Sequence, residues 1–115
     1  MAAILPGATI GILGGGQLGR MTAMAARSLG YDVAVLDPDP ACAAGAVASR
    51  VVASEFGDPA GAAELARGSA VVTYEIEKIL QAALQAAAEL APVRPAPSVL
   101  ALVQDRARQK AWLVS

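Results

Sequence analysis

The sequence predicts a single α/β domain of Rossmann type, with a doubly wound parallel sheet of four to five strands. Short, continuous apolar runs alternate with helical segments, as in a parallel sheet that helices cover on both faces. The first apolar run, residues 8–13, leads directly into three consecutive glycines, Gly14 to Gly16, and then into a helical segment. Because right-handed crossovers join such strands, we expect one sheet with the first strand at its centre.

The glycines after the first strand fit the G-x-G-x-x-G pattern at Gly14, Gly16 and Gly19. In this pattern the first glycine permits a sharp turn, the second lets a ligand approach the backbone, and the third lets the helix pack closely. The helix then offers unpaired N–H groups and a partial positive charge to a phosphate. We therefore predict an anion site at residues 14–17. The alternative is a tight turn that binds nothing.

The segment after the glycines has helical periodicity. Apolar or small residues recur at three- and four-residue steps, at Leu18, Met21 or Thr22, Ala25 and Leu29. This spacing is typical of an α-helix. Gly30 fits its C-terminal cap.

Cap and turn signals predict the remaining elements. Asp58 fits a helix N-cap, Pro59 the first helical position and Gly68 the C-terminal cap of the same helix. Further strands are expected at residues 32–36, 50–53 and 70–74, with a fifth of two or three residues within 92–95. Further helices are expected at residues 43–48 and 59–67. Another is expected to follow residue 77 and to end near residue 90, and two more are expected after Ser98 and after Asp105.

Composition excludes several classes of function. The chain has 115 residues, with nine Lys or Arg, ten Asp or Glu, no histidine and a single cysteine, Cys42. Histidine chemistry, an internal disulfide and a cysteine zinc cluster are therefore excluded, and we expect no metal site and no catalytic residue in this chain. We expect no nucleic acid partner without a basic patch, and no membrane span without an apolar run of about 18 residues. The N-terminus lacks a positively charged leader, so we expect a cytoplasmic protein.

Asp37 comes at the end of the second predicted strand, and ligands bind at the carboxyl ends of strands in such sheets. It lies 18 residues after Gly19, where an acid usually holds a ribose hydroxyl in dinucleotide-binding folds. The segment from Asp37 to Pro40 fits an ordinary turn equally well, with Asp side chains bonded to the backbone. Both interpretations stay open from the sequence.

Two further stretches carry charge near predicted strand or helix ends. Glu75 and Glu77 would point to opposite sides of an extended segment, which makes them a poor catalytic pair. We expect Glu75 to face a ligand and Glu77 to favour the next helix start, although both could serve only that helix. Gln17 can donate and accept hydrogen bonds in the glycine loop. Arg106 belongs to a basic cluster that is either a solvated helix face or a charge for an anionic ligand.

Four stretches together resemble the N-terminal domain of the 5-(carboxyamino)imidazole ribonucleotide synthetase family, in the ATP-grasp superfamily. They are GILGGGQLGRM, LDPDP, VVTYEIEKI and PAPSVLALVQDRARQKAWL, in this order along nearly the whole chain. The resemblance implies a Rossmann-like, pre-ATP-grasp substrate-binding domain at residues 1–104. Residues 105–115 would then begin the connection to an ATP-grasp domain that this chain lacks.

The resemblance also implies an activity and its partners. Family enzymes are ligases of purine biosynthesis that carboxylate 5-aminoimidazole ribonucleotide with ATP and bicarbonate. The resemblance implies that the complete enzyme uses Mg²⁺ with ATP and that it can form a homodimer. By similarity, the ribonucleotide would contact residues of the glycine turn and the acid after the fourth strand, namely Gly15, Gly16, Gln17, Leu18 and Glu75. Arg106 would contact ATP. We expect this chain alone to bind the ribonucleotide, to hold no cofactor and to lack activity.

Two other interpretations compete with this one. The glycine spacing and Asp37 also fit the NAD(P)-binding domain of an oxidoreductase, whereas the Y-E-I-E and Q-D-R segments fit only the ligase. A Rossmann-like scaffold or assembly domain with no catalytic role is the third.

Overall fold

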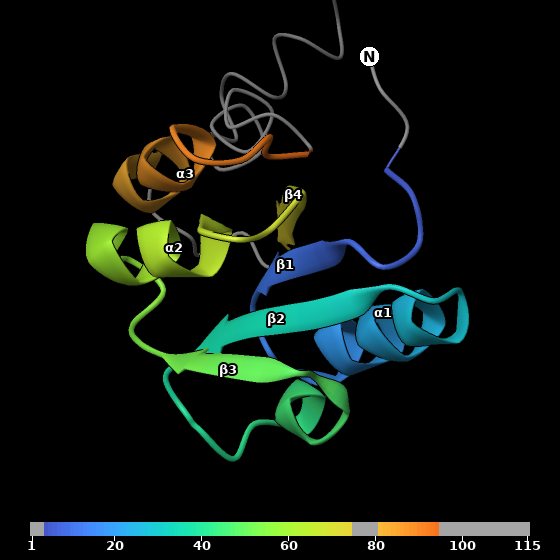
Figure 1. Cartoon of the computed structure of the whole chain (residues 1–115). Helices are drawn as coiled ribbons and strands as arrows, with labels where there is room; N and C mark the ends of the chain where they lie inside the picture. The colour runs from blue at the N-terminus through green and yellow to red at the C-terminus, as the bar shows by residue number, and fades with distance from the viewer. Residues whose placement is uncertain (1–3, 75–80, 95–115) are drawn as a thin grey trace, which may run out of the picture.

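A parallel sheet forms the centre of the structure (Figure 1). The computed structural model describes residues 4–74 and 81–94. Its four strands are β1 (Thr9–Leu13), β2 (Asp32–Asp37), β3 (Arg50–Ala53) and β4 (Val71–Tyr74), in the order β3-β2-β1-β4. All three pairings are parallel. The α/β parallel sheet that the sequence predicts is therefore confirmed, and β1 lies inside the sheet as expected.

The predicted fifth strand is reduced to a single bridge in the described residues. Val93 pairs with Val72 of β4 in parallel. The N–H of Val72 donates to the carbonyl of Pro92 at 2.8 Å, and the N–H of Arg94 donates to the carbonyl of Val72 at 2.9 Å. Proline accepts but cannot donate, so Pro92 suits the outer edge of a sheet.

Helices cover both faces of the sheet, as continuous apolar strands require. They are α1 (Gln17–Ser28), the 3-10 helix η1 (Ala43–Val47), α2 (Pro59–Ala66) and α3 (Gln81–Ala88). In Figure 1, α2 and α3 lie on one side of the sheet and α1 lies on the other. The two helices predicted after Ser98 and Asp105 lie outside the described residues, as does the segment between β4 and α3.

Alternate residues of the strands supply two separate cores. Leu13 and Leu36 are fully buried in the core beneath α2 and α3. Their neighbours Ile12 and Val35 are buried in the core beneath α1 and η1. Successive side chains of a strand point to opposite faces, so a strand with both faces covered needs apolar residues at every position.

The helix α1 buries its small residues and exposes its large ones. Its buried positions are Gly19, Ala23 and Ala26, while Leu18 is 63% exposed and Met21 is 64% exposed. The periodicity of large apolar residues therefore located the helix but does not mark its buried face. Small residues let the helix axis lie close to β1 and β2.

The predicted start of α2 is confirmed. A carboxylate oxygen of the N-cap residue Asp58 accepts the N–H of Ala60 at 3.0 Å. The other oxygen accepts the hydroxyl of Ser54 at 2.6 Å, and this bond is the main cause that lowers the pKa of Asp58. Pro59 follows at the first helical position, where its missing N–H costs nothing.

Candidate functional site

The glycine turn lies at the carboxyl end of β1, between the ends of β2 and β4. Leu13 pairs with Leu36 on one side and with Tyr74 on the other. The N–H of Gly14 donates to the carbonyl of Leu36 at 2.9 Å, which continues the β1–β2 pairing by one bond. Gly14 then turns the chain with φ of 114°. Only glycine adopts this backbone readily, so the predicted role of the first glycine is confirmed.

Gly15 is fixed on all sides. Its N–H donates to a carboxylate oxygen of Asp37 at 2.9 Å, and its carbonyl accepts the N–H of Ala44 at 2.9 Å. A Cβ at this position would lie 2.6 Å from Sγ of Cys42 and 3.0 Å from Cγ1 of Val35. No side chain fits there without displacement of its neighbours. The sequence motif does not single out Gly15, because its pattern allows any residue at that position.

The predicted ligand-binding residues after Gly15 lie at the start of α1. Gly16 is the N-cap residue of the helix, and Gln17 is its first residue. Gly16, Gln17 and Leu18 are all exposed. The first turn of α1 carries no acidic side chain, so no carboxylate of that turn offsets the positive end of the helix. The arrangement suits an anion, and the contacts predicted for these residues stay predictions.

Asp37 acts here as a turn residue. One carboxylate oxygen accepts the N–H of Gly15, and the other accepts the N–H of Asp39 at 2.9 Å. A carboxylate of Asp39 in turn accepts the N–H of Ala41 at 2.8 Å. The turn interpretation of this segment is therefore confirmed. The bond to Gly15, which joins residues 22 apart in the sequence, was not predicted.

Arg20 lies beside the glycine turn and was not singled out from the sequence. Its guanidinium Nη1 donates to the carbonyl of Ala43 at 3.1 Å. This bond ties the first turn of α1 to η1, next to the residue whose N–H binds Gly15. Its place in the run GGGQLGR was the only available signal, and the sequence does not tell a structural arginine from an anion ligand.

Tyr74 ends β4 beside the glycine turn. It is half-buried, and burial raises the pKa of its phenol. The hydroxyl therefore stays neutral at pH 7 and keeps its proton for a hydrogen bond. The predicted contacts at Glu75 and Arg106 fall outside the described residues.

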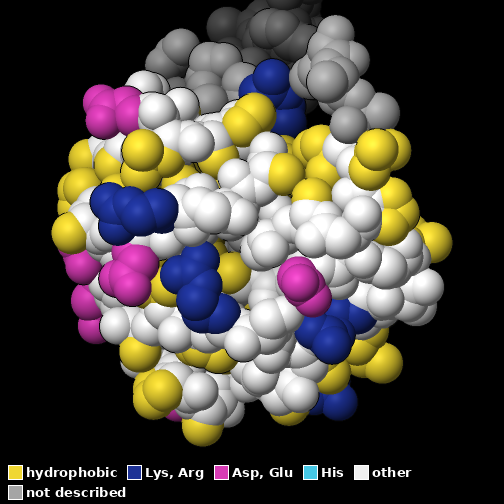
Figure 2. Space-filling model, in the orientation of Figure 1, with side chains coloured by type: hydrophobic (Ala, Val, Ile, Leu, Met, Phe, Trp, Pro, Cys, Tyr) yellow, Lys and Arg dark blue, Asp and Glu magenta, His cyan; other side chains and the backbone are white. Residues whose placement is uncertain are grey.

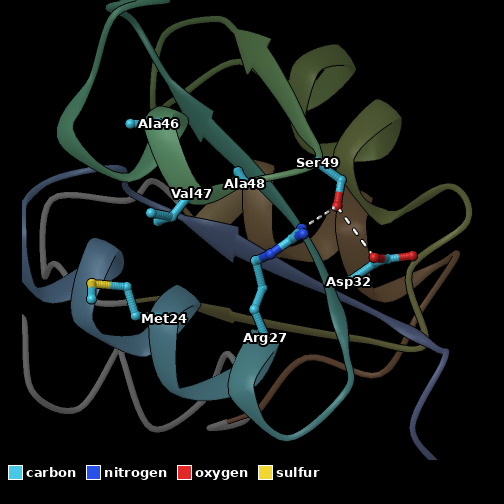
Figure 3. Close-up of a pocket in the computed structure, with 7 residues that line it drawn as sticks. All are labelled: Met24, Arg27, Asp32, Ala46, Val47, Ala48 and Ser49. Atoms are coloured by element: carbon cyan, nitrogen blue, oxygen red, sulfur yellow. Dashed lines mark hydrogen bonds between the residues drawn. The ribbon is translucent and has the colours of Figure 1, made fainter.

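A hollow of about 570 Å³ lies at the opposite edge of the sheet (Figure 3). It is lined by Met24, Arg27, Asp32, Ala46, Val47, Ala48 and Ser49. Nη1 of Arg27 donates to the hydroxyl of Ser49 at 3.0 Å, and this hydroxyl donates to Asp32 at 3.5 Å. Asp32 lines the hollow and begins β2, whereas Asp37 binds Gly15 and ends it, so at roughly 3.3 Å per residue these two residues lie about 16 Å apart along the strand. On the η1 side, Ala46 of the lining lies only two residues after Ala44, whose N–H binds Gly15.

Charges on the described surface are mixed. On the side of the molecule that Figure 2 shows, basic and acidic side chains are interspersed among neutral atoms. Within residues 4–74 and 81–94, no group of three His, Cys, Asp or Glu side chains is placed to hold a metal ion. None of the helices in this part of the chain has the length and apolar character needed to cross a membrane. The cytoplasmic location stays a prediction.

Comparison with known proteins decides the family. The family model of the ribonucleotide synthetase preATP-grasp domain matches residues 7–104. The chain belongs to this family. It is 48% identical over 108 residues to the N5-carboxyaminoimidazole ribonucleotide synthase of Brucella melitensis, and 40% identical over 108 residues to that of Staphylococcus epidermidis. These alignments cover 94% of this chain but only 30% and 29% of the relatives.

Solved structures agree with this membership of the preATP-grasp family. The ADP complex of an N5-carboxyaminoimidazole ribonucleotide synthetase superposes with a TM-score of 0.88 at 42% identity, over 94% of this chain and 29% of that one. The enzyme from Thermotoga maritima gives a TM-score of 0.86 at 39% identity, over 92% and 30%. The glycinamide-RNase-transformylase T of Mycobacterium tuberculosis, at 20% identity and a TM-score of 0.79, shares the fold.

These findings separate the interpretations that the sequence left open. The chain spans about 30% of the length of its curated relatives, and those named above are N5-carboxyaminoimidazole ribonucleotide synthases. The resemblance stated from the motifs is confirmed, and the NAD(P)-binding alternative gains no support from them. The proposed domain boundary at residue 104 stays a prediction.

Proposed function

We propose that this chain is the ribonucleotide-binding part of a purine-biosynthesis ligase, which carboxylates 5-aminoimidazole ribonucleotide to N5-carboxyaminoimidazole ribonucleotide. The observation that carries the proposal is the 48% identity to a synthase of this name along 94% of the chain. The exposed N-terminus of α1 at the carboxyl edge of the sheet supports it, since such a site suits the ribonucleotide phosphate.

In the proposed reaction, bicarbonate takes the γ-phosphoryl group of ATP, which gives ADP and carboxyphosphate. The exocyclic amine of the ribonucleotide then forms a bond to the carboxyl carbon. The bond from that carbon to the phosphate oxygen breaks, phosphate leaves, and the amine nitrogen loses a proton. This chain would bind and orient the ribonucleotide through the exposed residues Gly16 to Leu18 and through Glu75, with Gly15 buried behind them. Arg106 would contact ATP.

The glycine turn offers a direct test of ligand class. We expect the native chain to bind 5-aminoimidazole ribonucleotide and, more weakly, ribose 5-phosphate in calorimetric titrations, and to give no heat with NAD. Gly16→Val should weaken ribonucleotide binding at least ten-fold, because the side chain blocks approach to the backbone. Gly16 has φ of −75°, which is outside the positive range that favours glycine, so the variant needs no left-handed backbone.

The matched control for Gly16→Val is Ala25→Val. Ala25 is exposed on the same helix α1, far from the glycine turn, and this variant should bind the ribonucleotide as the native chain does. Tight NAD binding by the native chain, or unchanged ribonucleotide binding by Gly16→Val, would contradict the proposal.

A further inference from the structure

The carboxylate of Asp37 joins the glycine turn to the loop after β2. It ends β2, and its two oxygens accept the N–H groups of Gly15 and Asp39, each at 2.9 Å. Its own carbonyl accepts the N–H of Ser54 at 3.2 Å. Hydrogen bonds to a charged acceptor are shorter and stronger than neutral ones. The carboxylate of Asp37 therefore anchors the glycine turn to the end of β2.

The carbonyl side of Gly15 is fixed by the same loop. The N–H of Ala44 donates to it at 2.9 Å, and Arg20 binds the carbonyl of the preceding residue, Ala43, at 3.1 Å. The buried Cys42 covers the Cα of Gly15. Both peptide groups of Gly15 are thus restrained, and their planes set the direction of the chain into Gly16 and α1.

We propose that Asp37 is a positioning residue of the ligand site. By fixing Gly15, it aims the N–H groups at the start of α1 toward one phosphate group. The N–H of Gly15 already donates to the carboxylate of Asp37, so it does not donate to a phosphate. The carboxylate is also committed to the turn rather than to the ribose of a dinucleotide. The ligand part of this inference rests on the proposed function.

The sign of one mutational effect separates positioning from simple electrostatics. A carboxylate near a bound phosphate repels it, so removal of its charge alone should tighten binding. If Asp37 positions the turn, Asp37→Ala should instead weaken binding of ribose 5-phosphate about five- to ten-fold. Asp39→Ala removes the same charge from the same loop without breaking the bond from Gly15, and it should change the affinity less than two-fold.

A second measurement reads the anchoring without any ligand. Amide hydrogen exchange, followed by NMR on the 115-residue chain, should show Gly15 exchanging at least ten-fold faster in Asp37→Ala, with the amides of β1 and β2 unchanged. The amide proton of Gly15 should also lose the downfield shift that a carboxylate acceptor gives. Asp37→Asn keeps the shape and one acceptor oxygen, so it should show smaller changes in the same direction and serves if Asp37→Ala unfolds.

The outcomes are distinct. Tighter binding of ribose 5-phosphate by Asp37→Ala or Asp37→Asn overturns the positioning role, as does unchanged exchange at Gly15. If the native chain binds neither ribose 5-phosphate nor 5-aminoimidazole ribonucleotide, the proposed function fails and the ligand part of this inference fails with it. The exchange rate of Gly15 then still decides whether Asp37 anchors the turn.

Discussion

At the scale of single residues, the glycines of the turn have different tasks. Gly14 needs the backbone freedom of glycine, with φ of 114°. Gly15 needs the space, because a Cβ would lie 2.6 Å from Sγ of Cys42. The sequence showed three glycines in a row but not which requirement each one meets. That division depends on Cys42 and Asp37, which reach the turn only through the fold.

Gly15→Ala should therefore destabilise the chain through crowding. Overpacking of a well-packed site typically costs about 1–3 kcal/mol, and we expect a loss in this range in urea unfolding. Cys42→Ala, which removes Sγ, should restore part of the loss when combined with Gly15→Ala. Restoration should be incomplete, since Cγ1 of Val35 is 3.0 Å from the added Cβ.

The Gly15 result has a clear contrary outcome. If Gly15→Ala and the double variant with Cys42→Ala lose the same unfolding free energy, Sγ of Cys42 is not the atom that excludes a side chain. The comparison requires that the free energy of unfolding falls with urea concentration at the same slope in both variants, because a changed slope would signal a different unfolded or native state.

At the scale of elements, the sequence predicted where the strands and helices lie along the chain better than it predicted which face of a helix is buried. Apolar runs located all four strands, and cap residues located the start of α2, because these signals are local. The buried face of α1 could not be predicted from its large apolar residues. Its buried residues are Gly19, Ala23 and Ala26. Gly11 in β1 is likewise a small residue at a close contact, since a Cβ there would lie 2.9 Å from the hydroxyl of Ser69.

Two substitutions on α1 test which face is buried. Ala23 is fully buried and Met21 is 64% exposed. Ala23→Leu should lower the free energy of unfolding by about 1–3 kcal/mol, as overpacking does. Met21→Gln should change it by less than about 0.5 kcal/mol, as an exposed substitution does. The reverse ranking in urea unfolding would mean that α1 is rotated and that its large side chains face the sheet.

At the scale of the whole molecule, strand order assembles the site. Because β1 lies between β2 and β4, the glycine turn meets Asp37 on one side and lies beside Tyr74 on the other. Convergence at the carboxyl edge was predictable from the alternation of strands and helices. The bond between Gly15 and Asp37 was not, since it depends on how a side chain at the end of one strand meets a turn 22 residues away.

The whole molecule also sets what this chain can do alone. It spans about 30% of its curated relatives, so we expect binding of the ribonucleotide without turnover of ATP. Phosphoryl transfer requires cationic groups and metal ions held around the transferred phosphate. With ATP, Mg²⁺, bicarbonate and 5-aminoimidazole ribonucleotide present, ADP release should equal that of a blank.

The positive control for this assay is the synthetase of Staphylococcus aureus, whose solved structure holds ADP, at the same molar concentration. It should release ADP under the conditions in which the 115-residue chain does not. ADP release that rises in proportion to the concentration of the pure chain, and that falls in Arg106→Ala, would overturn the expectation. It would show that the ATP-dependent step needs no more than the residues of this chain.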